Sequence, residues 1–408
     1  MIHISLSPNL EIDDVWLSLK WLISPFRWSD KNSQEKLKRK LSALFPQAKA
    51  IFLFNSGRSA LMLGLKALNL PKNSKILLQA FTCSAVPNSI LWNQLVPEYL
   101  DIKKTDYNLN PKNLPQNPTA RALIVQHTFG QPANLDKIID YCQKNKLYLI
   151  EDCAHSLGAS YRGRAIGTFG DFSILTFGRD KVISSVFGGA LIVNNENLVK
   201  PIENLYQNLA SPSSFWTFQQ LLHPSITYLS RRTYRLYLGK VILTVAQKIK
   251  LISKAIYSKE YLHQVPAVFP SRLPEPLADL ASHQLSKLDR FNKQRQKIAF
   301  YYNEKMRHSF ISKPTLYPEG IYLRYTILLD QPEKLKSYLK RHGIIIEKKH
   351  WYTQPITPSI NLSLINYRKG QCPVAEEICQ KCLNLPTNPL MSMKDAKYIV
   401  ELINKWQP

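Results

Sequence analysis

The chain has 408 residues, 45% of them hydrophobic, which is enough to build two domains with substantial cores. Its 54 lysine and arginine residues against 29 aspartate and glutamate residues give a formal net charge of +25 at pH 7, so the surface attracts anions. Six cysteines in this length exclude a disulfide-rich scaffold, and no helix-turn-helix, zinc-finger or RNA-binding motif points to nucleic acid as the main ligand.

The first strand–turn–helix unit lies near residue 50. Ile51–Phe54 reads as a short buried strand, Asn55–Ser59 as a glycine-containing turn, and Ala60–Leu68 as a helix. Free backbone N–H groups and the positive end of the helix dipole make such a turn an anion site. Arg58 adds a planar cation that suits phosphate oxygens. A Ser-Gly turn that only caps a core helix is the plain alternative.

Strand and helix signals continue to alternate through the first two hundred residues. Ala122–His127 is expected to be a strand, Asp136–Lys144 a helix and Tyr148–Glu151 the next strand. This alternation predicts an α/β fold in which a mostly parallel sheet is covered by helices on both faces.

Asp152 and Lys181 each follow an expected strand. Asp152 comes after Tyr148–Glu151, and Lys181 after the apolar run Phe172–Phe177. Open α/β sheets bind ligands at the carboxyl ends of their strands, where Gly57 is also expected. A buried carboxylate and a lysine are what a pyridoxal phosphate (PLP) enzyme requires: the carboxylate keeps the pyridine nitrogen protonated, and the amine forms the Schiff base and later moves the proton. Since acids and lysines are common at strand ends, the pair alone does not decide the matter.

A basic and aromatic segment occupies about residues 211–262. From Pro212 to Lys259 it contains no aspartate or glutamate. Its apolar stretches are broken by charges and are too short to span a bilayer. We expect an insertion that forms a helical dimer interface or a substrate lid with a solvated basic face. A helix lying in a membrane interface, joined there by Trp16, Trp21 and Trp28, is the alternative.

A second, smaller α/β domain is expected at residues 276–408, after a large PLP-binding domain at residues 1–275. It opens with one long helix from Leu280 to about Met306 and includes a strand at Tyr322–Asp330. Cys372, Cys379 and Cys382 invite a zinc interpretation, but a structural site normally needs four ligands. Core packing in a helical stretch is the better interpretation of Cys379 and Cys382, and no metal is predicted.

Six segments, in order, resemble the DegT/DnrJ/EryC1/StrS family of PLP-dependent sugar aminotransferases. Asn55–Leu61 is similar to the phosphate loop, and Glu151–Ala159 to the pyridine-binding motif. Gly170–Lys181 matches the run into the Schiff-base lysine. The other segments are Gln79–Leu91, Gln126–Asp136 and, for the small domain, Gln371–Glu377 with Leu383–Pro389. The resemblance covers most of the chain and implies the fold type I of PLP-dependent transferases.

The resemblance implies a role for each matching residue. Lys181 falls on the catalytic lysine that binds the cofactor, and Asp152 on the carboxylate paired with the pyridinium. His155 falls near the ring oxygen of the cofactor, with a satisfied helix-start histidine as its plain alternative. The remaining cofactor-binding positions are Thr176 at the phosphate, Gly57, Arg58 and Ser59 in the phosphate loop, and Cys83 at the ring.

Three positions depart from the family pattern. The family more often has Thr at the position of Arg58. The ring-stacking aromatic of many members aligns with Cys83, so either Phe81 substitutes or the ring lacks a stacking face. Val186 and Phe187 stand where Gly-Glu is usual before two glycines, so a carboxylate is absent.

The resemblance therefore implies an aminotransferase. We expect transfer of an amino group, with glutamate as the donor, to a nucleotide-linked keto-deoxysugar used for surface polysaccharide or glycoconjugate synthesis. A homodimer is expected. With no signal peptide ahead of Met1, a cytoplasmic location is also expected, with peripheral contact at the inner membrane face as the alternative noted above.

Two other functions stay open on the sequence. A PLP-dependent deoxysugar dehydratase is opposed by Lys181, because members with that activity carry histidine there. A catalytically lapsed, basic membrane-associated or regulatory binding protein is favoured by the departures at Cys83 and Phe187 and opposed by the Asp152, Lys181 and Thr176 set.

Overall fold

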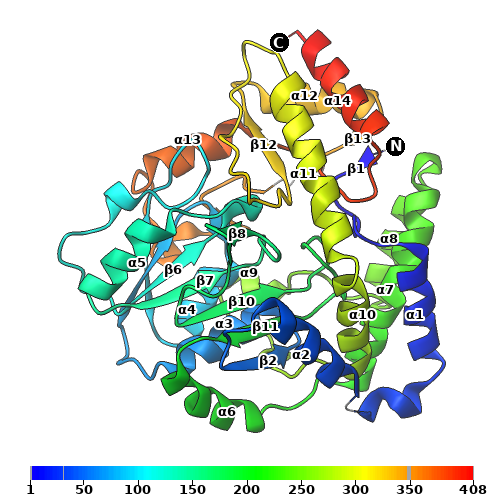
Figure 1. Cartoon of the computed structure of the whole chain (residues 1–408). Coiled ribbons are helices and arrows are strands. Elements are labelled where there is room, and N and C mark those ends of the chain that lie inside the picture. Colours follow the sequence, from blue (N-terminus) through cyan, green and yellow to red (C-terminus); the bar gives the residue numbers. More distant parts are fainter. Residues whose placement is uncertain (1, 31, 347–350, 408) are drawn as a thin grey trace.

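A seven-stranded sheet forms the centre of the computed structural model, which describes residues 2–30, 32–346 and 351–407 (Figure 1). Its spatial order is β2-β11-β10-β7-β6-β3-β5. The neighbours from β10 to β5 run parallel, whereas β11 is antiparallel to β10 and β2. The predicted α/β class is confirmed. The strands are β2 (Ala50–Phe54), β3 (Lys75–Gln79), β5 (Val96–Leu100), β6 (Ala122–Gln126), β7 (Tyr148–Asp152), β10 (Phe172–Thr176) and β11 (Gly189–Val193).

Helices cover both faces of this sheet. They are α2 (Asn32–Leu44), α3 (Gly57–Ala67), α4 (Ala85–Trp92), α5 (Leu135–Lys144) and α6 (Val199–Gln207). Successive strand residues point to opposite faces. Leu123 of β6 accordingly lies in the core shared with α2 and α5, and Ile124 in the core shared with α3, α4 and α6. Because both faces are buried, the strands read as continuous apolar runs in the sequence.

The expected helix from Leu280 to about Met306 is two helices, α10 (Glu275–Leu285) and α11 (Leu288–Lys305). At the break, the Lys287 ammonium lies 2.6 Å from an oxygen of Asp13 and 3.1 Å from an oxygen of Asp14. Both acids are in the first turn of α1 (Ile12–Leu22). This ion-pair cluster ties the junction of the two helices to the N-terminal segment. Helical periodicity is a local pattern, so it could not predict a break that depends on this distant contact.

The C-terminal part has its own core, in which α11 packs with α14. Its elements are β12 (Tyr325–Leu328), α12 (Pro332–Arg341), β13 (Ile344–Ile345), β14 (Ile356–Thr357), α13 (Pro373–Lys381), β15 (Cys382–Leu385) and α14 (Met393–Lys405). Strand β12 is shorter than expected and pairs antiparallel with β15. The N-terminal β1 (Ile2–His3) joins β13. The domain boundary at 275/276 stays a prediction.

Short elements complete the chain. The strands are β4 (Thr82–Cys83), β8 (Ser160–Tyr161) and β9 (Arg164–Ala165), and the 3-10 helices are η1 (Pro25–Ser29), η2 (Pro111–Asn113), η3 (Thr128–Gly130), η4 (Glu196–Leu198), η5 (Tyr234–Leu236) and η6 (Leu362–Ile365).

The basic segment folds as a helical hairpin at one edge of the molecule (Figure 1). The hairpin consists of α7 (Ser214–Arg232), η5 and α8 (Leu238–Lys248). The one-turn α9 (Ser258–Tyr261) follows it and lies outside the hairpin, where Glu260 pairs with Arg58 of α3. Helix α7 packs against both α1 and α8. Within the described ranges, no helix is long and apolar enough to cross a membrane.

Candidate active site

Lys181 lies in the loop that joins β10 to β11, beyond the carboxyl end of β10. The loop is closed on itself by the Phe177 N–H, which donates to the Gly188 carbonyl at 2.8 Å, and by the Ser185 N–H, which donates to the Phe177 carbonyl at 2.9 Å. From outside, the Asn9 side-chain amide donates to the Lys181 carbonyl at 2.7 Å. The backbone that carries the lysine is therefore held on both sides.

Arg295 of α11 completes this support. Its guanidinium is buried, 1% exposed, and donates to the Asn9 side-chain oxygen at 2.9 Å and to the Val182 carbonyl at 2.8 Å. Asn9 and Arg295 were not predicted from the sequence, because neither belongs to a motif and each lies more than 100 residues from Val182.

Asp152 ends β7 and is buried. Its Oδ1 accepts a hydrogen bond from the Ala154 N–H at 3.0 Å, and no residue in the described ranges forms an ion pair with it. Burial raises the pKa of this carboxyl, an effect that the charge of Lys181 partly opposes. A buried carboxylate costs free energy unless it meets a cation. A protonated pyridine nitrogen supplies that cation, so the residue fits PLP.

The Lys181 amine lies within electrostatic reach of both Asp152 and Cys83. Burial lowers the pKa of the amine, and the Asp152 carboxylate raises it in part. A lysine whose pKa is lowered holds more of its neutral form near neutral pH, and neutral amine is the form that attacks a carbonyl or accepts a proton.

Trp351 brings an aromatic face to this amine. The Lys181 Nζ lies 4.5 Å from the centroid of the Trp351 ring, and the Arg324 guanidinium lies 5.3 Å from it. Trp351 was not predicted from the sequence, because it lies outside every motif. Phe81 was the candidate substitute for the absent stacking residue, but its ring packs against Tyr107, Phe129 and Tyr352.

His155 also contacts Trp351. The two rings are stacked, with centroids 4.8 Å apart and planes 11° apart. The Nδ1 of His155 accepts a hydrogen bond from the Phe129 N–H at 3.3 Å. Burial, and then the charge of Lys181, lower the pKa of His155 well below its ordinary value, so its ring is neutral. The residue lies in a turn after β7 and not at the start of a helix, and its place at the cofactor ring stays a prediction.

The phosphate loop has the expected strand–turn–helix form. The Ser56 side chain caps α3 by accepting a hydrogen bond from the Ser59 N–H at 3.1 Å. A Cβ on Gly57 would lie 2.9 Å from the Cβ of Thr176, so glycine alone fits there. Gly57, Ser59 and the Thr176 hydroxyl therefore meet at the N-terminus of α3, where an anion is favoured.

The side chain of Arg58 turns away to the basic segment. Its guanidinium forms an ion pair with Glu260 of α9, with an N–O distance of 2.6 Å to Oε1, and also donates to the Ala255 carbonyl at 3.2 Å. The Glu260 side chain is 3% exposed and the Arg58 side chain 15%. The backbone N–H of Arg58 stays in the first turn of α3, but the guanidinium is committed to Glu260 in the structure.

We therefore expect Arg58→Ala to destabilise the cofactor-free protein. The substitution leaves Glu260 buried without its cation, which typically costs about 3–5 kcal/mol. Urea unfolding of the apoprotein measures this, with Arg39→Ala, an exposed arginine on α2, as the matched control. A different result would make the guanidinium a phosphate ligand instead. In that case Arg58→Ala would weaken PLP binding, and the free energy of unfolding of the apoprotein would equal that of Arg39→Ala.

Phe187 stands where the family usually has a carboxylate, and its contacts explain the difference. Its ring packs edge-on against Trp216 of α7, with centroids 5.4 Å apart, and the guanidinium groups of Arg58 and Arg179 lie 5.7 and 5.5 Å from its centroid. Arg179 in turn donates to the Ser253 carbonyl at 2.8 Å. The position at which the family usually has a carboxylate therefore serves here as the platform for the basic segment.

The model of the DegT/DnrJ/EryC1/StrS aminotransferase family matches residues 18–223 and 243–404. Among curated proteins, the chain is 24% identical over 356 residues to dTDP-3-amino-3,6-dideoxy-alpha-D-galactopyranose transaminase of Aneurinibacillus thermoaerophilus, covering 86% of this chain and 84% of that protein. It is 23% identical over 360 residues to GDP-perosamine synthase of Escherichia coli, with the same two coverages.

A solved structure gives the same fold. The aminotransferase PseC of Helicobacter pylori, which is involved in the biosynthesis of pseudoaminic acid, superposes with a TM-score of 0.73 at 19% identity, covering 97% of this chain and 96% of that one. The relatives named here are transaminases or aminosugar synthases, which does not favour a lapsed binding protein.

Proposed function

We propose that this chain, which belongs to the DegT/DnrJ/EryC1/StrS aminotransferase family and is a PLP-dependent aminotransferase, transfers an amino group from glutamate to a nucleotide-linked keto-deoxysugar. The observation that carries the proposal is the site itself: a buried Asp152, with no ion-pair partner among the described residues, beside a Lys181 whose loop is held by Asn9.

When bound, PLP supplies a carbonyl that exchanges an amino group and a ring that withdraws electrons. Asp152 would hold the ring nitrogen in its protonated form, because the buried carboxylate needs a cation. The first turn of α3, with Gly57 and Ser59, and the Thr176 hydroxyl would hold the phosphate. Cys83, His155 and Trp351 would border the ring.

Lys181 would move the proton. Its Nζ would accept the proton from the α-carbon of the donor and deliver a proton to the carbon that becomes aminated in the acceptor. Burial favours the neutral amine that the first of these steps needs. The hold of Asn9 and Arg295 on the loop keeps the amine in place through both half-reactions.

The acceptor class rests on two observations. Two relatives, each matched by this chain over 84% of its length, are named for amino sugars linked to GDP or dTDP. The net charge of +25 favours the approach of a nucleotide diphosphate. We infer a role in surface polysaccharide or glycoconjugate synthesis, a homodimer and a cytoplasmic location.

The visible absorption spectrum of the purified protein with PLP tests this proposal. We expect a band of the lysine-bound cofactor that glutamate bleaches, and that an added nucleotide-linked ketosugar restores. Alanine or aspartate in place of glutamate identifies the donor by comparison. A spectrum that no amino acid changes would contradict the donor reaction, and a bleached band that no ketosugar restores would contradict the acceptor class.

A further inference from the structure

Helix α8 carries an apolar stripe on its outer side. Leu238, Val241, Val245 and Ile249 are 52%, 57%, 48% and 63% exposed. Their spacing of three or four residues places them on one side of the helix. In an ordinary surface helix such a side faces the core, whereas here it faces outward.

A different side of α8 packs on the protein. Gly239 and Ala246 are the buried residues of α8, and a Cβ on Gly239 would lie 2.1 Å from the Ser230 carbonyl oxygen of α7. The glycine therefore brings α8 into close contact with α7. The outward apolar stripe is a consequence of this packing and is not an unfilled part of the core.

Other exposed apolar side chains occur just before α8 and on α1. Leu236 and Tyr237, just before α8, are 70% and 71% exposed. At the same edge of the molecule, α1 also packs on α7 (Figure 1), and there Trp16 and, after the helix, Ile23 are 66% and 79% exposed. A soluble monomer rarely exposes so many large apolar side chains together unless they bind something.

The charge around the stripe is of one sign. No aspartate or glutamate occurs between Pro212 and Lys259. Lys240 and Lys248 of α8 and Lys250 after it are exposed. The basic residues of the segment are Arg231, Arg232, Arg235, Lys240, Lys248, Lys250, Lys254 and Lys259.

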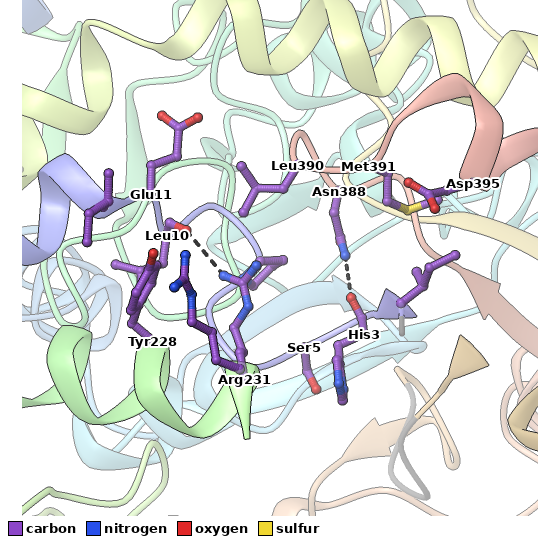
Figure 2. Close-up of a pocket in the computed structure, with 14 residues that line it drawn as sticks. His3, Ser5, Leu10, Glu11, Tyr228, Arg231, Asn388, Leu390, Met391 and Asp395 are labelled. Carbon is purple, nitrogen blue, oxygen red and sulfur yellow. Dashed lines mark hydrogen bonds between the residues drawn. The ribbon is translucent and has the colours of Figure 1, made fainter. Parts of the chain in front are cut away.

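The hairpin is fixed to the N-terminal segment near the turn that joins α7 to α8. The residues drawn in Figure 2 line a cavity there, which has a volume of about 480 Å³. Beside it, the Arg231 guanidinium donates to the Leu10 carbonyl at 3.2 Å. At the other end, the Gln219 side chain of α7 closes the hairpin by donating to the Lys250 carbonyl at 2.6 Å. The segment that follows is tied to the body by the ion pair of Glu260 with Arg58. Hydrogen bonds therefore hold both ends of the hairpin that carries the stripe. The family model does not match residues 224–242, which include the end of α7 and the start of α8.

We propose that the α7–α8 hairpin is a docking surface for an anionic phospholipid bilayer, on which the enzyme binds peripherally. Apolar side chains flanked by lysines suit the boundary between acyl chains and anionic headgroups. A second copy of the chain fits less well, because a symmetric contact would bring these lysines against each other. A nucleic acid would satisfy the lysines but not the stripe. The proposal does not depend on the identity of the amino acceptor.

The test is co-sedimentation of the PLP-loaded protein with vesicles. We expect binding to vesicles that contain phosphatidylglycerol and at least tenfold weaker binding to pure phosphatidylcholine. Val241→Asp with Val245→Asp should weaken binding to the anionic vesicles at least tenfold, since it places carboxylates at the bilayer surface. Lys240→Gln with Lys248→Gln should weaken it several-fold. Phe310→Asp, an equally exposed apolar residue of the C-terminal part, is the control and should have no effect.

Sedimentation equilibrium of the same variants and a nucleic-acid binding assay complete the design. The proposal is overturned if the wild-type protein fails to bind anionic vesicles, or if the two aspartates leave binding unchanged. It is also overturned if those aspartates change the oligomeric state of the protein, which assigns the stripe to a second copy. Tighter binding to single-stranded RNA than to vesicles would assign the segment to nucleic acid. The absorption band of the bound cofactor in every variant confirms that the variants are folded.

Discussion

Lys181→Ala is expected to lower the transamination rate by at least roughly 10⁴-fold, because it removes both the amine that binds the cofactor and the group that moves the proton. Binding of PLP should persist, since the helix α3 N-terminus and Asp152 are unchanged. The visible band of the lysine-bound cofactor should be absent. Steady-state turnover and the absorption spectrum measure these effects together.

A matched control is Lys66→Ala, an exposed lysine of α3, which should leave both readouts unchanged. Added methylamine should restore part of the activity of the Lys181 variant, because a small amine can enter the space that the side chain leaves. Retention of transamination by Lys181→Ala without an added amine would disprove the role of this residue.

Asp152→Asn has the second largest expected effect, a fall in kcat of about 10²–10³-fold, the usual effect of removing one charged group that stabilises a transition state. A neutral amide cannot keep the ring nitrogen protonated. The same variant should make the apoprotein more stable at pH 7. Burial raises the pKa of Asp152, so the folded state loses stability as the pH rises from the ordinary range of aspartate through that raised pKa. Asparagine removes this loss.

Glu151→Gln is the contrasting control for Asp152→Asn. The two acids are adjacent on β7, but the Glu151 carboxylate accepts hydrogen bonds from the N–H groups of Gly167, Phe169 and Gly170 at 2.7 to 2.9 Å. Its loss should lower the stability of the fold and leave kcat of the folded fraction nearly unchanged. Urea unfolding and active-site titration separate the two effects. Equal losses of kcat in both variants would mean that Asp152 acts only through the fold.

The sequence predicted the parts of the site that follow buried strands. Asp152 comes directly after an apolar run, Lys181 follows the end of a second run after a short gap, and Gly57 opens a helix after a third. Chain order alone therefore brings them to one edge of a parallel sheet. Strand limits were correct within a residue or two for β2, β6, β7 and β10 for the same reason. These features depend on local patterns of hydrophobicity.

The rest depends on contacts between distant parts of the chain. Asn9 reaches Lys181 across 172 residues, and Arg58 reaches Glu260 across 202. Trp351 approaches Lys181 from the C-terminal part. No periodicity or motif in one segment specifies the partner of a side chain in another. The break between α10 and α11 has the same origin, because it is held by acids of α1.

The position of Asn9 has a consequence for the order of folding. The contact joins residues 172 positions apart, and the pairing of β2 with β11 also joins residues 135 to 143 positions apart, so both form after the local strand–helix units. Arg295, which fixes Asn9 across 286 positions, must also have arrived. Until both contacts have formed, the loop that carries Lys181 lacks the hydrogen bonds from Asn9 and Arg295 that hold it in the native structure. Refolding experiments should then find that native secondary structure returns before catalytic competence.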